Sequence, residues 1–360
     1  MIKFIHTADI HLGLQFNNVS FDQEKAMARR REIWSTFERI VEKSIDDDID
    51  FLFIAGDLFE SSYFTLGDMK RVRDTLATCN GVNVIISAGN HDYIDEKSLY
   101  NKVEWSSNVT IFNWGLEEKH FKELNTIVYG YSWDRIEIRE SLILDNLTRD
   151  HNMNEILMLH GDIGSSSNYM PLDIKKLRDL NMDYIALGHI HKPNFFTEKI
   201  AYSGCPEPLD FGEIGDRGII IGTINEGVTK TELLPFSKRR FFRSDINLDN
   251  KMGYLDIINN IKAINIGDRK LDFYRVTLQG YIDNDLNLTS LVHDLESFFY
   301  HIEIIDNTEP DFDLEALESA NKDNIIGQFI STMKSKGLEN HTVKDSLHYG
   351  LSALLKGRVL

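Results

Sequence analysis

Five short segments of the chain place Asp, Asn or His directly after an apolar run, and these residue types can bind metal ions and transfer protons. In an extended segment, residues i and i+2 point to the same side, so an Asp-x-His or His-x-His pair can reach one common centre. The segments are Asp9-Ile10-His11, Gly56-Asp57, Gly89-Asn90-His91-Asp92, His160-Gly161-Asp162 and Gly188-His189-Ile190-His191.

Together these segments supply seven oxygen and nitrogen donors, namely Asp9, His11, Asp57, Asn90, His160, His189 and His191. Seven donors are too many for one tetrahedral ion. They suit two divalent metal ions that share a bridging carboxylate, with water completing each coordination shell. The segments therefore predict a two-metal site.

The elements that must position these donors predict an α/β fold. Short apolar runs alternate with helical patterns up to about residue 235, and runs this apolar are typical of strands buried on both faces. We expect stacked sheets flanked by helices. The expected strands are 2–6, 51–55, 82–88, 126–131, 156–160, 184–188, 218–224 and 228–234, and the expected helices are 22–44 and 68–79.

The pattern changes after Pro235, where a basic stretch contains Lys238, Arg239, Arg240 and Arg243. Residues 241–307 then predict strand, helix, strand, helix, strand. Between 303 and 318 lie seven acidic residues and no basic one, which predicts an exposed acidic connector, followed by two amphipathic helices. We therefore expect three parts: a core over 1–237, a small α/β capping domain over 238–309 and a helical segment over 310–360.

The charge balance limits the classes of function. The 360 residues include 57 acidic and 39 basic side chains, for a formal net charge of −18, whereas proteins that bind nucleic acid through their overall charge are usually positive. A nucleic-acid substrate therefore requires a local positive site, bound cations or a partner. No apolar run approaches the ~20 residues of a membrane span, no signal peptide is recognisable, and two unrelated cysteines fit a cytoplasmic protein.

The ordered set D-x-H, G-D, G-N-H-D, H-G and G-H-x-H resembles the calcineurin-like metallophosphoesterase superfamily. Within it, residues 6–13 (HTADIHLG), 56–59 (GDLF) and 203–212 (SGCPEPLDFG) are similar to the SbcD family, the nuclease subunits of a complex that processes DNA double-strand breaks. The resemblance implies a four-layer αββα sandwich with a capping domain and C-terminal helices. It also implies a metal-dependent exo- and endodeoxyribonuclease that acts in DNA repair.

The resemblance further implies a role for each site residue. One metal ion is held by Asp9, His11, Asp57 and His191, and the other by Asp57, Asn90, His160 and His189. The implied metal is Mn²⁺, while the donors are also compatible with Mg²⁺, Fe²⁺ or Zn²⁺. His91 is expected to contact the scissile phosphate and assist the leaving oxygen, held in orientation by Asp92.

Glu60 departs from the family pattern, which usually has His at this substrate-binding position to hold the DNA phosphate. A carboxylate there repels a phosphate, which puts the family's exonuclease preference in question. The basic residues Lys238, Arg239, Arg240 and Arg243 have two interpretations, a DNA-binding stretch or a charged strand edge at a domain junction. The family also implies a homodimer and an SbcC-type coiled-coil ATPase that binds the C-terminal helices.

Two other functions remain open. A phosphodiesterase or phosphatase for small molecules or lipids is favoured by the negative charge and by Glu60. A non-catalytic, metal-stabilised scaffold is disfavoured by His91 and Asp92, for which we expect no structural role.

Overall fold

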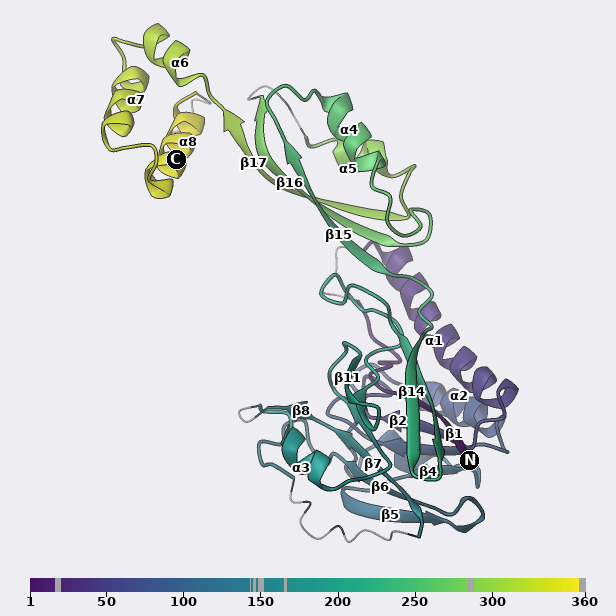
Figure 1. Cartoon of the computed structure of the whole chain (residues 1–360). Coiled ribbons are helices and arrows are strands. Elements are labelled where there is room, and N and C mark those ends of the chain that lie inside the picture. The colour runs from purple at the N-terminus through teal and green to yellow at the C-terminus, as the bar shows by residue number, and fades with distance from the viewer. Residues whose placement is uncertain are drawn as a thin grey trace. The chain divides into compact units, whose positions relative to one another are not determined.

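The computed structural model of the chain describes residues 1–16, 21–142, 144, 147, 152–164, 167–283, 286 and 288–355. They divide into two compact units, Met1–Arg240 and Phe241–Leu360 (Figure 1). The three-part division predicted above stays a prediction. Among the helices of these described ranges, none combines the length and the apolar character needed to cross a membrane.

The first unit is built on two six-stranded sheets, each with four successive parallel strands. The remaining strands, two in each sheet, pair antiparallel. The first sheet has the order β14 (Val228–Pro235), β13 (Gly218–Asn225), β1 (Ile2–Thr7), β2 (Phe51–Ala55), β3 (Asn83–Ser87) and β4 (Val109–Ile111). The second has the order β11 (Asn194–Thr197), β12 (Ile200–Tyr202), β10 (Tyr184–Gly188), β7 (Asn154–His160), β6 (Thr126–Ser132) and β5 (Gly115–Phe121).

Helices cover the outer face of each sheet. Helices α1 (Gln23–Asp46) and α2 (Leu66–Ala77) share one buried apolar cluster with strands of the first sheet, and α3 (Ile174–Asp179) shares another with the second sheet. A third cluster contains apolar side chains of both sheets, among them Phe4, Phe53 and Tyr184. The four-layer αββα sandwich predicted from the sequence is therefore confirmed.

Local sequence explains where these elements begin. The side chain of Asp22 accepts a hydrogen bond from the backbone of Lys25 at the start of α1, and Thr65 and Asp68 form a capping box at the start of α2. Every residue of β2 is buried, as expected for a central parallel strand. Shorter elements are the 3₁₀ helices Leu99–Lys102 and Lys122–Leu124 and the strand pair β8 (Asp162–Ile163) and β9 (Pro171–Leu172).

The second unit contains a parallel sheet of β15 (Phe241–Leu248), β16 (Phe273–Asp283) and β17 (His301–Asp311). Helices α4 (Tyr254–Lys262) and α5 (Leu291–Leu295) connect the strands and share an apolar cluster with them. The predicted order strand, helix, strand, helix, strand is confirmed. Helices α6 (Leu314–Ala320), α7 (Ile325–Ser335) and α8 (His341–Leu355) follow.

Two details of the second unit differ from the sequence-based expectation. Strand β17 extends to Asp311, so the first part of the predicted acidic connector pairs with β16 instead of forming a free linker. The first of the two predicted amphipathic helices, with apolar residues from Leu317 to Met333, is divided into α6 and α7. The division lies at Asn324, whose side chain accepts from the backbone of Ile326 and Gly327 and begins a new helix.

Candidate metal centre

All seven predicted donors lie at or just after the carboxyl end of a parallel strand. Asp9 and His11 follow β1, Asp57 follows β2, Asn90 follows β3, His160 ends β7, and His189 and His191 follow β10. The loops after β1 and β2 are tied together, since Asp9 N donates to Gly56 O at 3.1 Å and His11 N donates to Asp57 O at 3.0 Å. The parallel sheets therefore bring distant segments to one place.

Four of these donors have a left-handed backbone: φ is 52° at Asp9, 53° at His11, 54° at Asp57 and 102° at His189. Such values are uncommon for residues other than glycine and persist only where surrounding contacts hold them, often at functional sites. Gly56 is left-handed as well, and a Cβ there would lie 2.1 Å from Nδ1 of His160. Close packing of backbone against imidazole thus requires glycine at this position.

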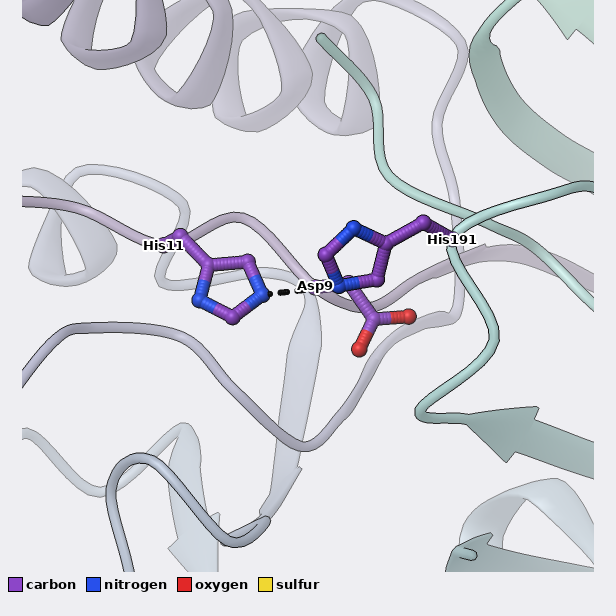
Figure 2. A group of neighbouring side chains, drawn as sticks. All are labelled: Asp9, His11 and His191. Carbon is purple, nitrogen blue, oxygen red and sulfur yellow. Dashed lines mark hydrogen bonds between the residues drawn. The ribbon is translucent and has the colours of Figure 1, made fainter. Parts of the chain in front are cut away.

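The first set of donors contains Asp9, His11 and His191, whose ligand atoms all lie within 4.8 Å of one another (Figure 2). The two Nε2 atoms of the histidines are 3.1 Å apart. Their Nδ1 atoms each meet a carboxylate, His11 at 2.7 Å from Glu60 and His191 at 2.5 Å from Glu213.

These carboxylates decide the protonation pattern of the first set. A carboxylate accepts, so each Nδ1 carries a hydrogen. Burial lowers the pKa of His191, but the Glu213 carboxylate outweighs this and raises the pKa to about 9. The two facing Nε2 atoms therefore need one positive charge between them, which a proton on His191 or a metal ion can supply. A carboxylate on the far nitrogen is also the usual support of a metal-binding histidine, so the set fits a divalent cation.

The second set contains Asp57, His160 and His189, again with ligand atoms within 4.8 Å of one another. Nδ1 of His160 donates to the carbonyl oxygen of Ala55 at 2.9 Å, which leaves Nε2 facing Asp57 Oδ2 at 3.2 Å and Asn90 Oδ1 at 3.0 Å. A bare nitrogen lone pair opposite two oxygens requires a proton or a metal ion.

The electrostatics of the second set favour that positive charge. Burial alone lowers the pKa of His160, but the Asp57 carboxylate raises it to about 9. Burial and the neighbouring His160 lower the pKa of His189 to about 3, so the ring stays neutral and able to bind a cation. Asp57 Oδ2 is also 3.9 Å from His11 Nε2, which places this carboxylate between the two sets.

The seven donors thus form two neighbouring sets of oxygen and imidazole nitrogen atoms. This chemistry suits Mn²⁺, Fe²⁺ or Zn²⁺. Which residue binds which ion stays a prediction.

The side chain of Glu60 faces two histidines and not the substrate side that the sequence predicted. Its side chain is only 12% exposed, and its two oxygens meet two imidazoles, Oε1 at 2.7 Å from His11 Nδ1 and Oε2 at 2.9 Å from His91 Nδ1. Burial favours the neutral acid, but the hydrogen bonds from His11 and His91 lower the pKa of Glu60 to about 2. The negative charge is therefore directed at the histidines.

Asp92 has a structural role, contrary to the expectation that it orients His91. Among the described residues no hydrogen bond joins the two side chains, because the fully buried Asp92 carboxylate accepts from other donors. Those donors are the backbone N–H groups of Asp57, Leu58 and Gly89 and the hydroxyl of Tyr100. Asp92 therefore fixes the loops after β2 and β3 to each other, and Glu60 orients His91.

The basic stretch does not act as one surface. Arg239 is buried and its Nε donates to Glu32 Oε1 at 2.7 Å, so it belongs to the interior of the first unit and not to a DNA-binding face. Lys238 and Arg243 are exposed, and Arg240 is half-buried.

Sequence reasoning missed two residues that support the donors. Glu213 accepts from His191, and its other oxygen accepts from the backbone of Leu209 at 2.7 Å. Trp133 donates from its indole nitrogen to the carbonyl oxygen of His160 at 2.7 Å. Glu213 lies outside the predicted strands and their ends. Trp133 comes two residues after the predicted strand 126–131, but tryptophan is not a metal-binding residue type, so the sequence offered no signal for either residue.

The amino-acid sequence of this chain is similar to those of several known proteins. A family model described as calcineurin-like phosphoesterase matches residues 2–193, just over half of the chain. The uncharacterized metallophosphoesterase YhaO of Bacillus subtilis (strain 168) is 30% identical over 240 residues, which cover 63% of this chain and 58% of YhaO. The DNA double-strand break repair protein Mre11 of Aeropyrum pernix is 26% identical over 238 residues, covering 61% of this chain and 56% of that protein. The chain thus matches less than two thirds of the length of either relative.

Proposed function

Because the chain belongs to the calcineurin-like phosphoesterase family, we propose that it is a DNA nuclease that hydrolyses phosphodiester bonds with two divalent metal ions, most closely related in function to the SbcD nucleases. The observation that carries this proposal is the pair of donor sets on either side of Asp57, next to the partly exposed imidazole of His91. Similarity to a protein named for DNA double-strand break repair supports DNA as the substrate.

We propose the following ligands for the two ions, and the donor sets support this division. Asp9, His11 and His191 hold one with Asp57, and Asn90, His160 and His189 hold the other with Asp57. When bound, two such ions polarise a phosphate oxygen and make water nucleophilic near neutral pH. We propose Mn²⁺ as the metal.

His91 is the residue that acts on the leaving group. Its side chain is 43% exposed, and Glu60 occupies Nδ1, so Nε2 is the ring nitrogen that can reach a substrate. Burial lowers the pKa of His91, but Glu60 and Asp57 reverse this and raise it above its ordinary value, which favours the protonated ring. A protonated imidazole in this place can give its proton to the leaving oxygen.

Replacing His91 with Gln tests this role. We expect the variant to keep its metal ions, because the donor sets remain, and to lose DNA cleavage by about 100-fold or more, because the leaving oxygen receives no proton. Metal analysis of the purified variant and a cleavage assay measure both. Loss of bound metal in His91→Gln would contradict the assignment and make this residue a ligand.

The substrate class is tested separately, because the net charge of −18 favours a small phosphodiester over DNA. The chain is incubated with Mn²⁺ and linear duplex DNA, single-stranded DNA or bis(4-nitrophenyl) phosphate. DNA cleavage supports the proposal. Turnover of the small ester alone supports a small-molecule phosphodiesterase, and inactivity on all three substrates supports a scaffold or an obligatory partner.

Further parts of the proposal concern partners. We propose that an SbcC-type ATPase binds helices α6 to α8, where Ile325 and Tyr349 expose apolar surface, and that it supplies positive charge for DNA. We also propose a homodimer, a cytoplasmic location, and DNA contacts by the exposed Lys238 and Arg243. Co-purification with the ATPase tests the first of these points.

A further inference from the structure

We propose that Glu60 is a positioning residue that holds the ligand His11 and the proton donor His91 with one carboxylate, and so decides which leaving groups the site can expel. This inference rests on the proposed function, because it concerns the same site. It assigns a purpose to the residue that departs from the family pattern.

Glu60 is itself held firmly. Its backbone N–H donates to Leu12 O at 3.0 Å, and its carbonyl oxygen accepts from the backbone of Tyr63 and Phe64 at 3.0 Å each. Next along the chain, Ser61 N donates to His91 O at 3.2 Å. The loop after β2 is therefore fastened to the loops that carry His11 and His91, and the carboxylate between them has little freedom.

One carboxylate fixes two imidazole rings. Oε1 accepts from His11 Nδ1 and Oε2 accepts from His91 Nδ1, so both rings are held in the form with hydrogen on Nδ1. The two ring centres are 4.8 Å apart and the rings are nearly perpendicular, at 87°. His11 Nε2 is thereby directed to the first donor set, while His91, on the exposed side, is prevented from turning away.

This arrangement has a chemical consequence for the leaving group. Hydrolysis forms a bond between phosphorus and the water oxygen, with one water proton released to solvent, and breaks the bond to the leaving oxygen, while one proton passes from His91 Nε2 to that oxygen. The imidazole later recovers a proton from solvent. A sugar alkoxide is a poor leaving group and needs this proton, whereas 4-nitrophenolate leaves without it. Misplacing His91 therefore harms the first kind of substrate selectively.

The experiment compares two substrates that share the same nucleoside, thymidylyl-thymidine and thymidine 5′-(4-nitrophenyl phosphate), at saturating Mn²⁺. We expect Glu60→Ala to lower kcat for the dinucleotide by about 100-fold or more and kcat for the nitrophenyl ester by less than about 5-fold. For the dinucleotide, kcat of Glu60→Gln should lie between those of the unaltered chain and Glu60→Ala, because the amide oxygen accepts from only one imidazole. Glu96→Gln, an exposed residue with the same charge change, is the matched control.

Two further measurements do not depend on turnover. Calorimetric titration with Mn²⁺ should show affinity about 10- to 100-fold weaker in Glu60→Ala, because His11 loses its support, and unchanged in Glu96→Gln. With Mg²⁺ bound, ¹H–¹⁵N NMR of the histidine rings should show the Nδ1–H signals of His11 and His91. Both signals should disappear in Glu60→Ala. Thermal melting checks that each variant is folded.

The outcomes separate this inference from the proposed function. If the unaltered chain hydrolyses neither substrate, the nuclease proposal fails, and the metal affinity and the Nδ1–H signals still decide the role of Glu60. An equal loss on both substrates, or unchanged Mn²⁺ affinity with both signals retained, overturns the inference.

Discussion

Asp57 lies within reach of both donor sets, and this makes it the residue on which the site depends most. Its Oδ2 is 3.2 Å from His160 Nε2 and 3.9 Å from His11 Nε2. Burial favours the neutral acid, yet the surrounding histidines, His160 first, hold the pKa of Asp57 well below its usual range. A buried carboxylate that stays ionised between two sets of imidazoles can serve both cations.

Replacing Asp57 with Asn removes that negative charge while keeping the shape of the side chain. We expect the variant to lose at least one of the two metal ions and to lose phosphodiester hydrolysis, since a neutral amide is a poor bridging ligand. Metal content per chain after dialysis measures the first effect. Asp46→Asn, which changes an exposed carboxylate at the end of α1, should keep both ions. Full metal content in Asp57→Asn would show that this residue is no bridge.

Residue types and spacing predict much of this site. Asp9 and His11, and likewise His189 and His191, are two positions apart after a strand, and this spacing predicted that both members of each pair reach the site. The structure brings them there through left-handed backbone at Asp9, His11 and His189 and not through an extended segment. Glu60 and Glu213 act on histidines from loops that are distant in sequence, and no periodicity links them to their partners. Their roles depend on tertiary contacts, and sequence reasoning therefore could not assign them.

At the scale of elements, a buried ionic cluster joins α1 to the loop before β13. Arg29 is fully buried and donates to Glu32 at 2.7 Å and to Glu207 at 3.1 Å. Glu32 also accepts from Arg239, and Glu207 accepts from Thr36 at 2.7 Å. The cluster therefore connects the long helix, the segment that leads toward Glu213 and the end of the first unit.

Replacing Arg29 with Met leaves the Glu32 and Glu207 carboxylates buried without the charge that Arg29 supplied. Breaking a buried ion pair in this way costs about 3–5 kcal/mol of unfolding free energy. The free energy of unfolding of the first unit, measured by denaturant titration, reports this loss. Arg73→Met, which removes an exposed pair with Asp74, should cost less than about 1 kcal/mol. Equal costs for the two variants would show that the Arg29 cluster adds no stability.

The elements themselves were predicted unevenly. Buried parallel strands such as β2 and β10 are uniformly apolar, so their sequences identify them. Strand β5 was missed because it lies at a sheet edge, where its sequence GLEEKHF turns charged side chains to solvent. The pairing of β17 with β16 likewise overrides the acidic composition near its end, since the backbone pairing with β16 continues to Asp311.

At the scale of the whole molecule, acidic residues outnumber basic ones in each of the two units. Overall attraction therefore cannot bring DNA to either unit, and contact with DNA must come from local groups or a partner. The three buried apolar clusters of the first unit contain only residues up to Ile224, with Phe236 packed against one of them. The first unit accordingly has its own core and its own donor sets.

A chain that ends at Arg240 tests how these two units divide the work. We expect it to fold, to bind two Mn²⁺ per chain and to hydrolyse bis(4-nitrophenyl) phosphate within about 3-fold of the full chain, because the apolar clusters and all seven donors remain. Cleavage of linear duplex DNA should fall by at least about 10-fold if, as we propose, the second unit contacts DNA. Melting temperature, metal content and both activities are measured side by side with the full chain.

If the shortened chain cuts DNA as well as the full chain does, the second unit has no part in binding DNA. If it cuts neither substrate while still folded and metal-loaded, the second unit contributes to the catalytic site itself.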